Sequence, residues 1–165
     1  MRPYRVCFVC TGNICRSPMA EVVFRALVER AGRGDAIEVD SAGTGHWHVG
    51  DGADPRALRT LADAGYDGRT HRARQFDPAW FAERDLVVAL DAGHLRALRR
   101  LRDAARVSTE IRLLRSFDPA SDGDLDVADP YYGDTPGFRE VLDQVERACE
   151  GLLAHVEDEL AARSA

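Results

Sequence analysis

A cysteine and an arginine near the start of the chain form the segment that most directly indicates chemistry. The segment runs Cys10-Thr11-Gly12-Asn13-Ile14-Cys15-Arg16-Ser17. The planar guanidinium of Arg16 can bind two phosphoryl oxygens side by side, and a thiolate at Cys10 is a nucleophile. Ser17 can donate a hydrogen bond to that sulfur. These residue types predict attack of a cysteine thiolate on a bound phosphate ester.

The flanking residues place this segment between a strand and a helix. Tyr4–Val9 is an apolar run that we expect to be a buried first strand. Ser17-Pro18 should open a helix, with Ser17 at the N-cap and Pro18 at the first helical position. Backbone N–H groups and the helix dipole at such a junction attract an anion and stabilise the thiolate form of Cys10. Gly12 and Asn13 tolerate a left-handed backbone. The predicted phosphate-binding residues are Thr11, Gly12, Asn13, Ile14, Cys15, Arg16 and Ser17.

Strands and helices alternate along the rest of the chain. Further strands are expected at Ile37–Ser41, Leu86–Leu90 and Ile111–Leu114, and helices at Pro55–Ala64, Ala92–Arg102 and from Phe138 to Leu160. This order predicts an α/β fold: a four-stranded parallel sheet with helices on both faces, doubly wound and Rossmann-like. Ligands bind such sheets at the carboxyl ends of the strands. The polar stretch Phe117–Gly137 is expected to be a long functional loop.

Composition narrows the class of protein. With 165 residues, 45% of them hydrophobic, we expect one domain spanning residues 1–165. The net charge of −6 argues against a nucleic-acid surface. Every basic residue is arginine, which excludes lysine chemistry. No apolar run is long enough to cross a bilayer, and four cysteines without a secretion signal are typical of cytoplasmic thiols. We therefore expect a cytoplasmic protein with no membrane partner.

A literal C-x-x-C at Cys7 and Cys10 invites a zinc or redox interpretation. In a strand these two side chains point to opposite faces, and no second pair of ligands has a zinc-site spacing. Cys7 is therefore expected in the core, as is Cys149 on the apolar face of the last helix. No metal and no cofactor are predicted.

Two motifs carry a resemblance to a known family. Val9–Glu21 (VCTGNICRSPMAE) resembles the phosphate loop of the low-molecular-weight protein tyrosine phosphatases, and Asp129–Gly133 (DPYYG) resembles their second signature. Thr44–Gly50 and His71–Gln75 are also similar to segments of the family, so the resemblance covers essentially the whole chain. It implies metal-independent hydrolysis through a phosphocysteine on Cys10.

The resemblance also implies the roles of individual residues. Arg16 would bind the phosphoryl group, and Asp129 would act as general acid and then as general base. Asp118-Pro119 is a competing Asp-Pro pair, and Asp129 is preferred on the resemblance. Asn13, Ser17, Ser41 and His71 match positions that brace the phosphate loop. The aromatic residues Trp47, Tyr131 and Tyr132 would wall a slot deep enough for phosphotyrosine.

Cys15 has two interpretations that the sequence leaves open. The family resemblance suggests a reversible disulfide with Cys10, which would protect the nucleophile from irreversible oxidation. The alternative is an ordinary packed loop residue. His46 and His48 are interpreted as surface polar groups rather than metal ligands.

Three other functions compete with tyrosine phosphatase activity. Arsenate reduction needs a relay of further cysteines, and Leu86–Leu101 contains none. Phosphoarginine hydrolysis is disfavoured because, by the same resemblance, arginine phosphatases carry Thr where this chain has Ile14. A binding module without catalysis is disfavoured because Cys10, Arg16 and Asp129 are all present. The expected partners are phosphotyrosine-containing proteins, a bacterial tyrosine kinase among them, and we expect a monomer or a weak dimer.

Overall fold

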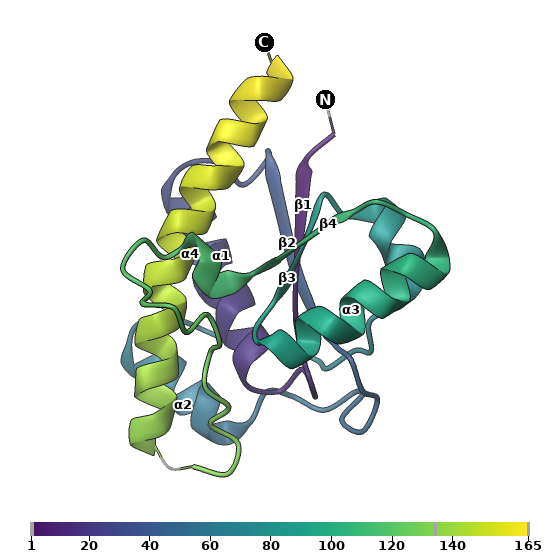
Figure 1. Cartoon of the computed structure of the whole chain (residues 1–165). Coiled ribbons are helices and arrows are strands. Elements are labelled where there is room, and N and C mark those ends of the chain that lie inside the picture. The colour runs from purple at the N-terminus through teal and green to yellow at the C-terminus, as the bar shows by residue number, and fades with distance from the viewer. Residues whose placement is uncertain (1, 134, 165) are drawn as a thin grey trace.

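The computed structural model describes residues 2–133 and 135–164. A four-stranded parallel sheet has the order β2-β1-β3-β4 (Figure 1). Its strands are β1 (Tyr4–Cys10), β2 (Ile37–Gly43), β3 (Leu86–Ala89) and β4 (Glu110–Leu113). The expected α/β fold is confirmed. Because all four strands are parallel, their carboxyl ends meet at one edge, the lower one in Figure 1.

Helices cover both faces of the sheet. The helices α1 (Arg16–Arg30), α2 (Pro55–Asp63) and α4 (Thr135–Ser164) lie on one face. The helix α3 (Ala92–Ala105) and the 3₁₀ segment η1 (Pro78–Glu83) cover the other, and a second 3₁₀ segment, η2 (Leu114–Phe117), packs against α4. None of the helices in the described ranges has the length and apolarity needed to cross a membrane.

Alternation along β1 divides the core into two clusters. Val6, Phe8 and Cys10 belong to the cluster under α1 and α4. Cys7 and Val9 belong to the cluster under α3. From Val6 onward both faces of β1 are buried, which is why the strand is apolar there instead of alternating with polar residues; only Arg5, near its start, is charged and half-buried. The prediction that Cys7 and Cys10 point to opposite faces is confirmed, and Cys149 is buried as expected.

The first helix begins earlier than predicted. Cys15, rather than Ser17, is its N-cap, and the N–H of Met19 donates to the Cys15 carbonyl over 3.1 Å. Pro18 lies in the first turn, where backbone N–H groups have no partner within the helix, so its missing donor costs nothing. The consequence is that Arg16 and Ser17 belong to the rigid first turn of α1 and not to the preceding loop.

Other boundaries move by one to four residues. The second strand continues to Gly43 because it pairs with β1 as far as Cys10. The third helix continues to Ala105 and ends where Arg106 takes a left-handed conformation, with φ of 57°. The last helix starts three residues earlier and ends four residues later than expected, and the other differences, at the ends of β1, α2 and β3 and in the placement of β4, are one residue each.

Candidate active site

The predicted nucleophile lies at the carboxyl end of the central strand. Cys10 is the last residue of β1, and α1 begins six residues later at Arg16. The Sγ of Cys10 is 2.9 Å from the Oγ of Ser17, and both residues are buried. Between them, Asn13 has a φ of 58°, so the loop turns through the left-handed conformation that its sequence predicts. The loop 11–15 therefore curls around the space in front of the sulfur.

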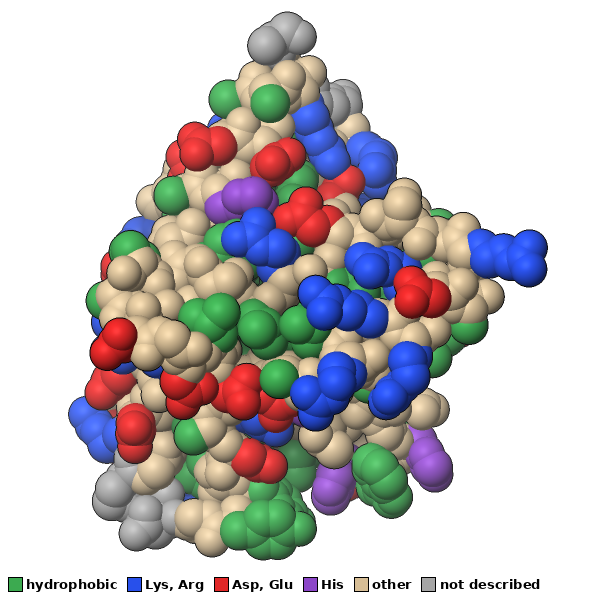
Figure 2. Space-filling view, viewed as in Figure 1, with side chains coloured by type: hydrophobic (Ala, Val, Ile, Leu, Met, Phe, Trp, Pro, Cys, Tyr) green, Lys and Arg blue, Asp and Glu red, His purple; other side chains and the backbone are tan. Residues whose placement is uncertain are grey.

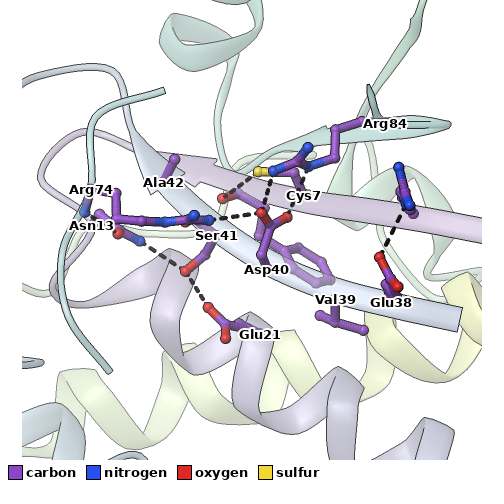
Figure 3. Close-up of polar contacts among 12 residues, drawn as sticks. Cys7, Asn13, Glu21, Glu38, Val39, Asp40, Ser41, Ala42, Arg74 and Arg84 are labelled. Carbon is purple, nitrogen blue, oxygen red and sulfur yellow. Dashed lines mark hydrogen bonds and ion pairs between the residues drawn. The ribbon is translucent and has the colours of Figure 1, made fainter. Parts of the chain in front are cut away.

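Asn13 holds this loop through both ends of its side chain. Its amide nitrogen donates to the Oγ of Ser17 over 2.8 Å and to the Oγ of Ser41 over 3.0 Å. Its amide oxygen accepts from the backbone N–H of Arg74 over 2.9 Å. The carbonyl oxygen of Asn13 accepts from the His71 ring over 2.7 Å. Burial lowers the pKa of His71, so the ring is neutral and donates one hydrogen bond. The structure thus brings Asn13, Ser17, Ser41 and His71 into one network, part of which appears in Figure 3.

Arg16 is fixed by neighbours from two segments, the start of α3 and the long loop before α4. Its Nη1 lies 2.8 Å from the Oδ2 of Asp91 and donates to the Val127 carbonyl over 2.9 Å. Its Nη2 lies 3.6 Å from the Oδ2 of Asp129. Burial opposes ionisation of Asp91, but the backbone N–H of His94 and the Arg16 guanidinium outweigh it, so the pKa of Asp91 lies below its usual value. Arg16 is therefore a pre-oriented cation directed at the pocket.

His94, on α3, links the loop to Arg16. Its Nε2 is 2.8 Å from the Oγ1 of Thr11 and 3.4 Å from the Nη2 of Arg16. Burial lowers the pKa of His94 to about 4, so the ring is neutral at pH 7. Because a guanidinium can only donate, Nε2 accepts, and the ring proton lies on Nδ1, 3.2 Å from the Oδ1 of Asp91.

Sequence analysis did not single out Asp91 or His94. The signal that could have found Asp91 is its position just beyond β3, since ligands of parallel sheets bind at the carboxyl ends of strands. His94 has no such signal, because its role depends on how α3 packs against the phosphate loop.

The long loop brings Asp129 to the mouth of the pocket, and α2 anchors it there. The N–H of Tyr131 donates to the Oδ1 of Asp129 over 3.1 Å. Arg56, on α2, donates to the carbonyls of Tyr131 and Gly133 over 2.8 and 2.9 Å. Asp54 caps α2 and forms hydrogen bonds to the Arg56 side chain. Arg56 and Asp54 were not anticipated.

Asp118, the competing acid, lies elsewhere. Its side chain is buried, accepts from the N–H of Ala120 over 2.9 Å, and lies 3.5 Å from Arg147. It is not among the residues that line the pocket. Asp118 therefore stabilises the loop, whereas Asp129 lines the same pocket as the Cys10 sulfur.

A pocket of about 240 Å³ opens over the nucleophile. The aromatic residues predicted to wall it do line it, and they lie around its mouth: Trp47 is 69% exposed, Tyr131 38% and Tyr132 93%. His48, a partly exposed residue as expected of a surface polar group, also lines the pocket, which the sequence did not indicate. The loop packs closely there, because a side chain added at Gly12 would come within 2.9 Å of the His48 ring.

The structure shows the surroundings of Cys15 and whether any side chains are arranged to hold a metal ion. Cys15 lines the pocket but is buried, and burial, reinforced by Asp54, raises the pKa of its thiol. All four cysteines are free thiols. Across residues 2–133 and 135–164, no cluster of three or more His, Cys, Asp or Glu side chains is arranged to hold a metal ion.

The loop between β1 and α1 brings the buried thiol of Cys10 and the fixed guanidinium of Arg16 to one pocket, and the long loop adds the carboxylate of Asp129. Such a site is that of a cysteine-dependent phosphatase. The sequence profile of the low molecular weight phosphotyrosine protein phosphatases matches residues 5–162, and the chain belongs to this family. Its activity is accordingly that of a protein-tyrosine phosphatase, a hydrolase of phosphotyrosine.

Individual relatives agree with this assignment. The chain is 64% identical over 163 residues to a low molecular weight protein-tyrosine-phosphatase of Streptomyces coelicolor, covering 98% of this chain and 99% of the relative. Among solved structures, YfkJ from Bacillus subtilis superposes with a TM-score of 0.88 at 38% identity, over 95% of this chain and 96% of that one. An arginine phosphatase of Drosophila superposes with a TM-score of 0.85 at 32% identity, over 92% and 96% of the two chains.

Proposed function

We propose that the chain hydrolyses phosphotyrosine in two steps that share Cys10 and Asp129. In the first step the Cys10 thiolate attacks phosphorus, the P–O bond to the phenol breaks, and Asp129 gives its proton to the leaving oxygen. In the second step a water attacks phosphorus, Asp129 takes up a proton from it, and the P–S bond breaks to release phosphate and the thiolate.

One observation carries this proposal. Cys10 and Arg16 belong to one short segment, Asp129 lies more than a hundred residues further along the chain, and all three line the same pocket. The guanidinium of Arg16 lies 3.6 Å from the Asp129 carboxylate, and Cys10 lines the same pocket. We propose that a phosphoryl group bound to Arg16 has the sulfur on one side and the acid on the other, as displacement at phosphorus requires.

The phosphate loop supplies the electrostatic part of the mechanism. Thr11, Gly12, Asn13, Ile14 and Cys15 offer backbone N–H groups ahead of α1, and Arg16 adds a full positive charge. Ser17, 2.9 Å from the sulfur, would donate a hydrogen bond to the thiolate and stabilise it when it leaves phosphorus. Ser41 and His71 act through Asn13 and hold the loop in shape.

The aromatic mouth supports phosphotyrosine as the substrate. Trp47, Tyr131 and Tyr132 can stack on a phenyl ring whose phosphate reaches the loop below. Phosphoserine has a shorter stem and would leave its phosphate short of the sulfur. The natural substrates we propose are phosphotyrosine-containing proteins, a bacterial tyrosine kinase among them. The free thiols support action in the cytoplasm. We propose that the protein acts as a monomer or a weak dimer.

Phosphoarginine hydrolysis is a second candidate, because an arginine phosphatase shares this fold at 32% identity. Ile14 argues against it, since its apolar side chain lines the pocket where the resemblance places Thr in arginine phosphatases. Comparing kcat/KM for phosphotyrosine and phosphoarginine peptides tests the choice. We expect the tyrosine peptide to be preferred, and the reverse preference would overturn it.

Hydrolysis of para-nitrophenyl phosphate in the presence of EDTA tests the proposed mechanism. Cys10→Ser should abolish turnover. Asp129→Asn should slow it by about two to four orders of magnitude, the usual contribution of a general acid. Asp118→Asn is the matched control and should keep most of its activity. An active Cys10→Ser protein, or a larger loss in Asp118→Asn than in Asp129→Asn, would refute the assigned roles.

The redox role of Cys15 is part of the same proposal. Its thiol lines the pocket with that of Cys10, which supports a reversible disulfide between them. Peroxide treatment followed by mass mapping should find the Cys10–Cys15 bridge. A stable sulfenic acid on Cys10 without a bridge would leave Cys15 as a packing residue.

A further inference from the structure

Asp40, on β2, joins two arginines from separate segments of the chain (Figure 3). Its Oδ2 lies 2.7 Å from the Nη2 of Arg74, and its two oxygens accept from the Nε and Nη2 of Arg84 over 3.2 and 2.5 Å. The ring of Trp80 lies 4.6 Å from the Arg74 guanidinium and 5.2 Å from that of Arg84. We refer to Asp40, Arg74, Trp80 and Arg84 as the Asp40 cluster. None of its members lines the pocket over Cys10.

The cluster reaches the phosphate loop through Arg74. While the side chain of Arg74 binds Asp40, its backbone N–H donates to the amide oxygen of Asn13 over 2.9 Å. An amide group is planar, so fixing its oxygen also aims its nitrogen. That nitrogen donates to Ser17, whose Oγ lies 2.9 Å from the Cys10 sulfur. A continuous chain of contacts therefore runs from Asp40 to the nucleophile.

We propose that Asp40 is a positioning residue for Cys10. By neutralising Arg74 and Arg84 together, it clamps the segment that contains Arg74 against β2 and so orients Asn13 in its left-handed conformation. Without Asp40, two neighbouring guanidiniums would repel each other, and only the backbone pairing of this segment with Gly43 would hold the Arg74 N–H against the Asn13 amide. Ser17 would then be free to turn away from the sulfur. This inference rests on the proposed role of Cys10.

The strand supplies a matched control two residues away. Glu38 is also an acidic residue of β2 and also pairs with an arginine, Arg5, over 3.1 Å (Figure 3). Its side chain is 57% exposed, and its pairing does not lead to the phosphate loop. Glu38→Gln therefore removes a charge and an ion pair from the same strand without touching the proposed connection.

The test compares Asp40→Asn, Arg74→Gln, their double variant and Glu38→Gln. Two quantities are measured at a fixed pH in proteins shown by circular dichroism to be folded: kcat for para-nitrophenyl phosphate, and the rate at which iodoacetamide alkylates Cys10. We expect Asp40→Asn and Arg74→Gln each to lower kcat about 10-fold, the lower end of what supporting residues contribute. The alkylation rate should fall with it, and the double variant should lose no more than either single one, because both break one connection.

The outcomes separate this inference from the proposed function. Full kcat in a folded Asp40→Asn protein, an equal loss in Glu38→Gln, or additive losses in the double variant would each overturn it. If Asp40→Asn does not fold, Arg74→Gln decides alone, by the same two measurements. Activity of the Cys10→Ser protein, in contrast, would refute the proposed function itself.

An independent observation concerns the outer face of α3. The side chains of Arg96, Arg99, Arg100 and Arg106 are exposed, and none of them forms an ion pair or hydrogen bond within the part of the chain that the structure describes. Figure 2 shows basic side chains gathered over α3 with an acidic one among them, while most acidic side chains lie elsewhere on this face. This local excess of positive charge contrasts with the net charge of −6 for the whole chain. Like charges at Arg96 and Arg100, one helical turn apart, also destabilise the helix.

The helix that carries Arg96, Arg99 and Arg100 begins beside the active site, and we refer to its exposed arginine side as the basic face. The same helix starts after Asp91 and carries His94, which contacts Arg16 in the pocket. Arg99 and Arg100 follow His94 by five and six residues, which is about 9 Å along a helix axis. A peptide that leaves the pocket over α3 would pass these guanidiniums within three or four residues of its phosphotyrosine.

We infer that this face binds acidic residues that flank phosphotyrosine in the substrate. The inference rests on the proposed function and is tested with two phosphotyrosine peptides, one with Asp and Glu flanking residues and one with Ser and Gln in their place. At low salt the wild-type protein should show at least about a fivefold higher kcat/KM for the acidic peptide, mostly through KM.

Arg99→Gln/Arg100→Gln should bring the ratio of the two kcat/KM values close to one. The control Arg30→Gln/Arg139→Gln, which neutralises two exposed arginines on α1 and α4, should leave the ratio unchanged. A ratio near one in the wild-type protein, or an equal fall in the control, overturns this inference. Failure to hydrolyse either peptide would instead refute the proposed function.

Discussion

Lowering the pH should destabilise the protein through His94, by an amount that the structure allows us to work out. The folded protein holds the pKa of His94 at about 4 because the ring is buried beside Arg16, whereas an unfolded chain restores a value of about 6.5. Between these two values the unfolded state binds a proton that the folded state does not. The stabilising contribution is therefore complete above about pH 6.5 and is lost as the pH falls toward 4.

The size of the effect follows from the two pKa values. One pKa unit corresponds to about 1.4 kcal/mol, so the whole interval is worth roughly 3 kcal/mol of unfolding free energy. Between pH 7 and about pH 4.5 most of the interval is crossed, and the expected loss from His94 is roughly 2 kcal/mol. His71 also has a lowered pKa and adds to the loss over this interval, whereas the contribution of Asp91, whose pKa is lowered as well, is lost only at still lower pH.

A comparison with His94→Asn isolates this contribution. Urea unfolding at several pH values gives the unfolding free energy of both proteins, and only the slope against pH is compared, because the substitution also changes packing. The wild-type protein should lose roughly 2 kcal/mol more than the variant between pH 7 and about pH 4.5. Parallel pH dependence in the two proteins would refute the reasoning, since it would mean that His94 titrates alike in the folded and unfolded states.

Three further outcomes are expected. Arg56→Gln releases the carbonyls of the loop that carries Asp129, so kcat for para-nitrophenyl phosphate should fall by about 10-fold while far-ultraviolet circular dichroism stays unchanged. Gly43→Ala should lower the free energy of unfolding, measured in urea, by more than about 1 kcal/mol, because a Cβ there would lie 2.6 Å from a backbone oxygen. Gly34→Ala meets open space and should be near neutral. Ile14→Thr should raise the ratio of phosphoarginine to phosphotyrosine turnover, measured with paired peptides, and an unchanged ratio would remove Ile14 as the discriminating residue.

The chemical residues of the loop could be predicted from the sequence because they act within a short stretch of chain. Cys10, Asn13 and Arg16 lie between a strand and a helix, and local rules of strand burial, left-handed turns and helix dipoles fix what such a segment can bind. The same is true of the separation of Cys7 from Cys10, which needs only the two-residue period of a strand. The fold class followed from the alternation of strands and helices.

The rules for helix starts misplaced the first residue of α1, where more than one residue could serve as the N-cap. Ser17-Pro18 has the form of a helix start, yet the helix begins at Arg16, because Pro is tolerated throughout the first turn and the Cys15 carbonyl already accepts a helical bond. His48 is partly exposed, as expected of a residue in a polar loop. The sequence could not show that its ring also lines the pocket, because this depends on how the loop packs against Gly12.

What only the tertiary structure decided is the surroundings of those chemical residues. Asp91 and His94 reach the site from the start of α3, and Arg56 from α2. All three lie more than thirty residues from the loop, and no periodicity in the sequence marks them. Asp40 lies on a strand next to Cys7 and becomes connected to Cys10 only because a later segment packs across β2. Sequence fixes which groups can react, because reactivity belongs to residue types and their neighbours in the chain. Packing between distant segments decides how those groups are held.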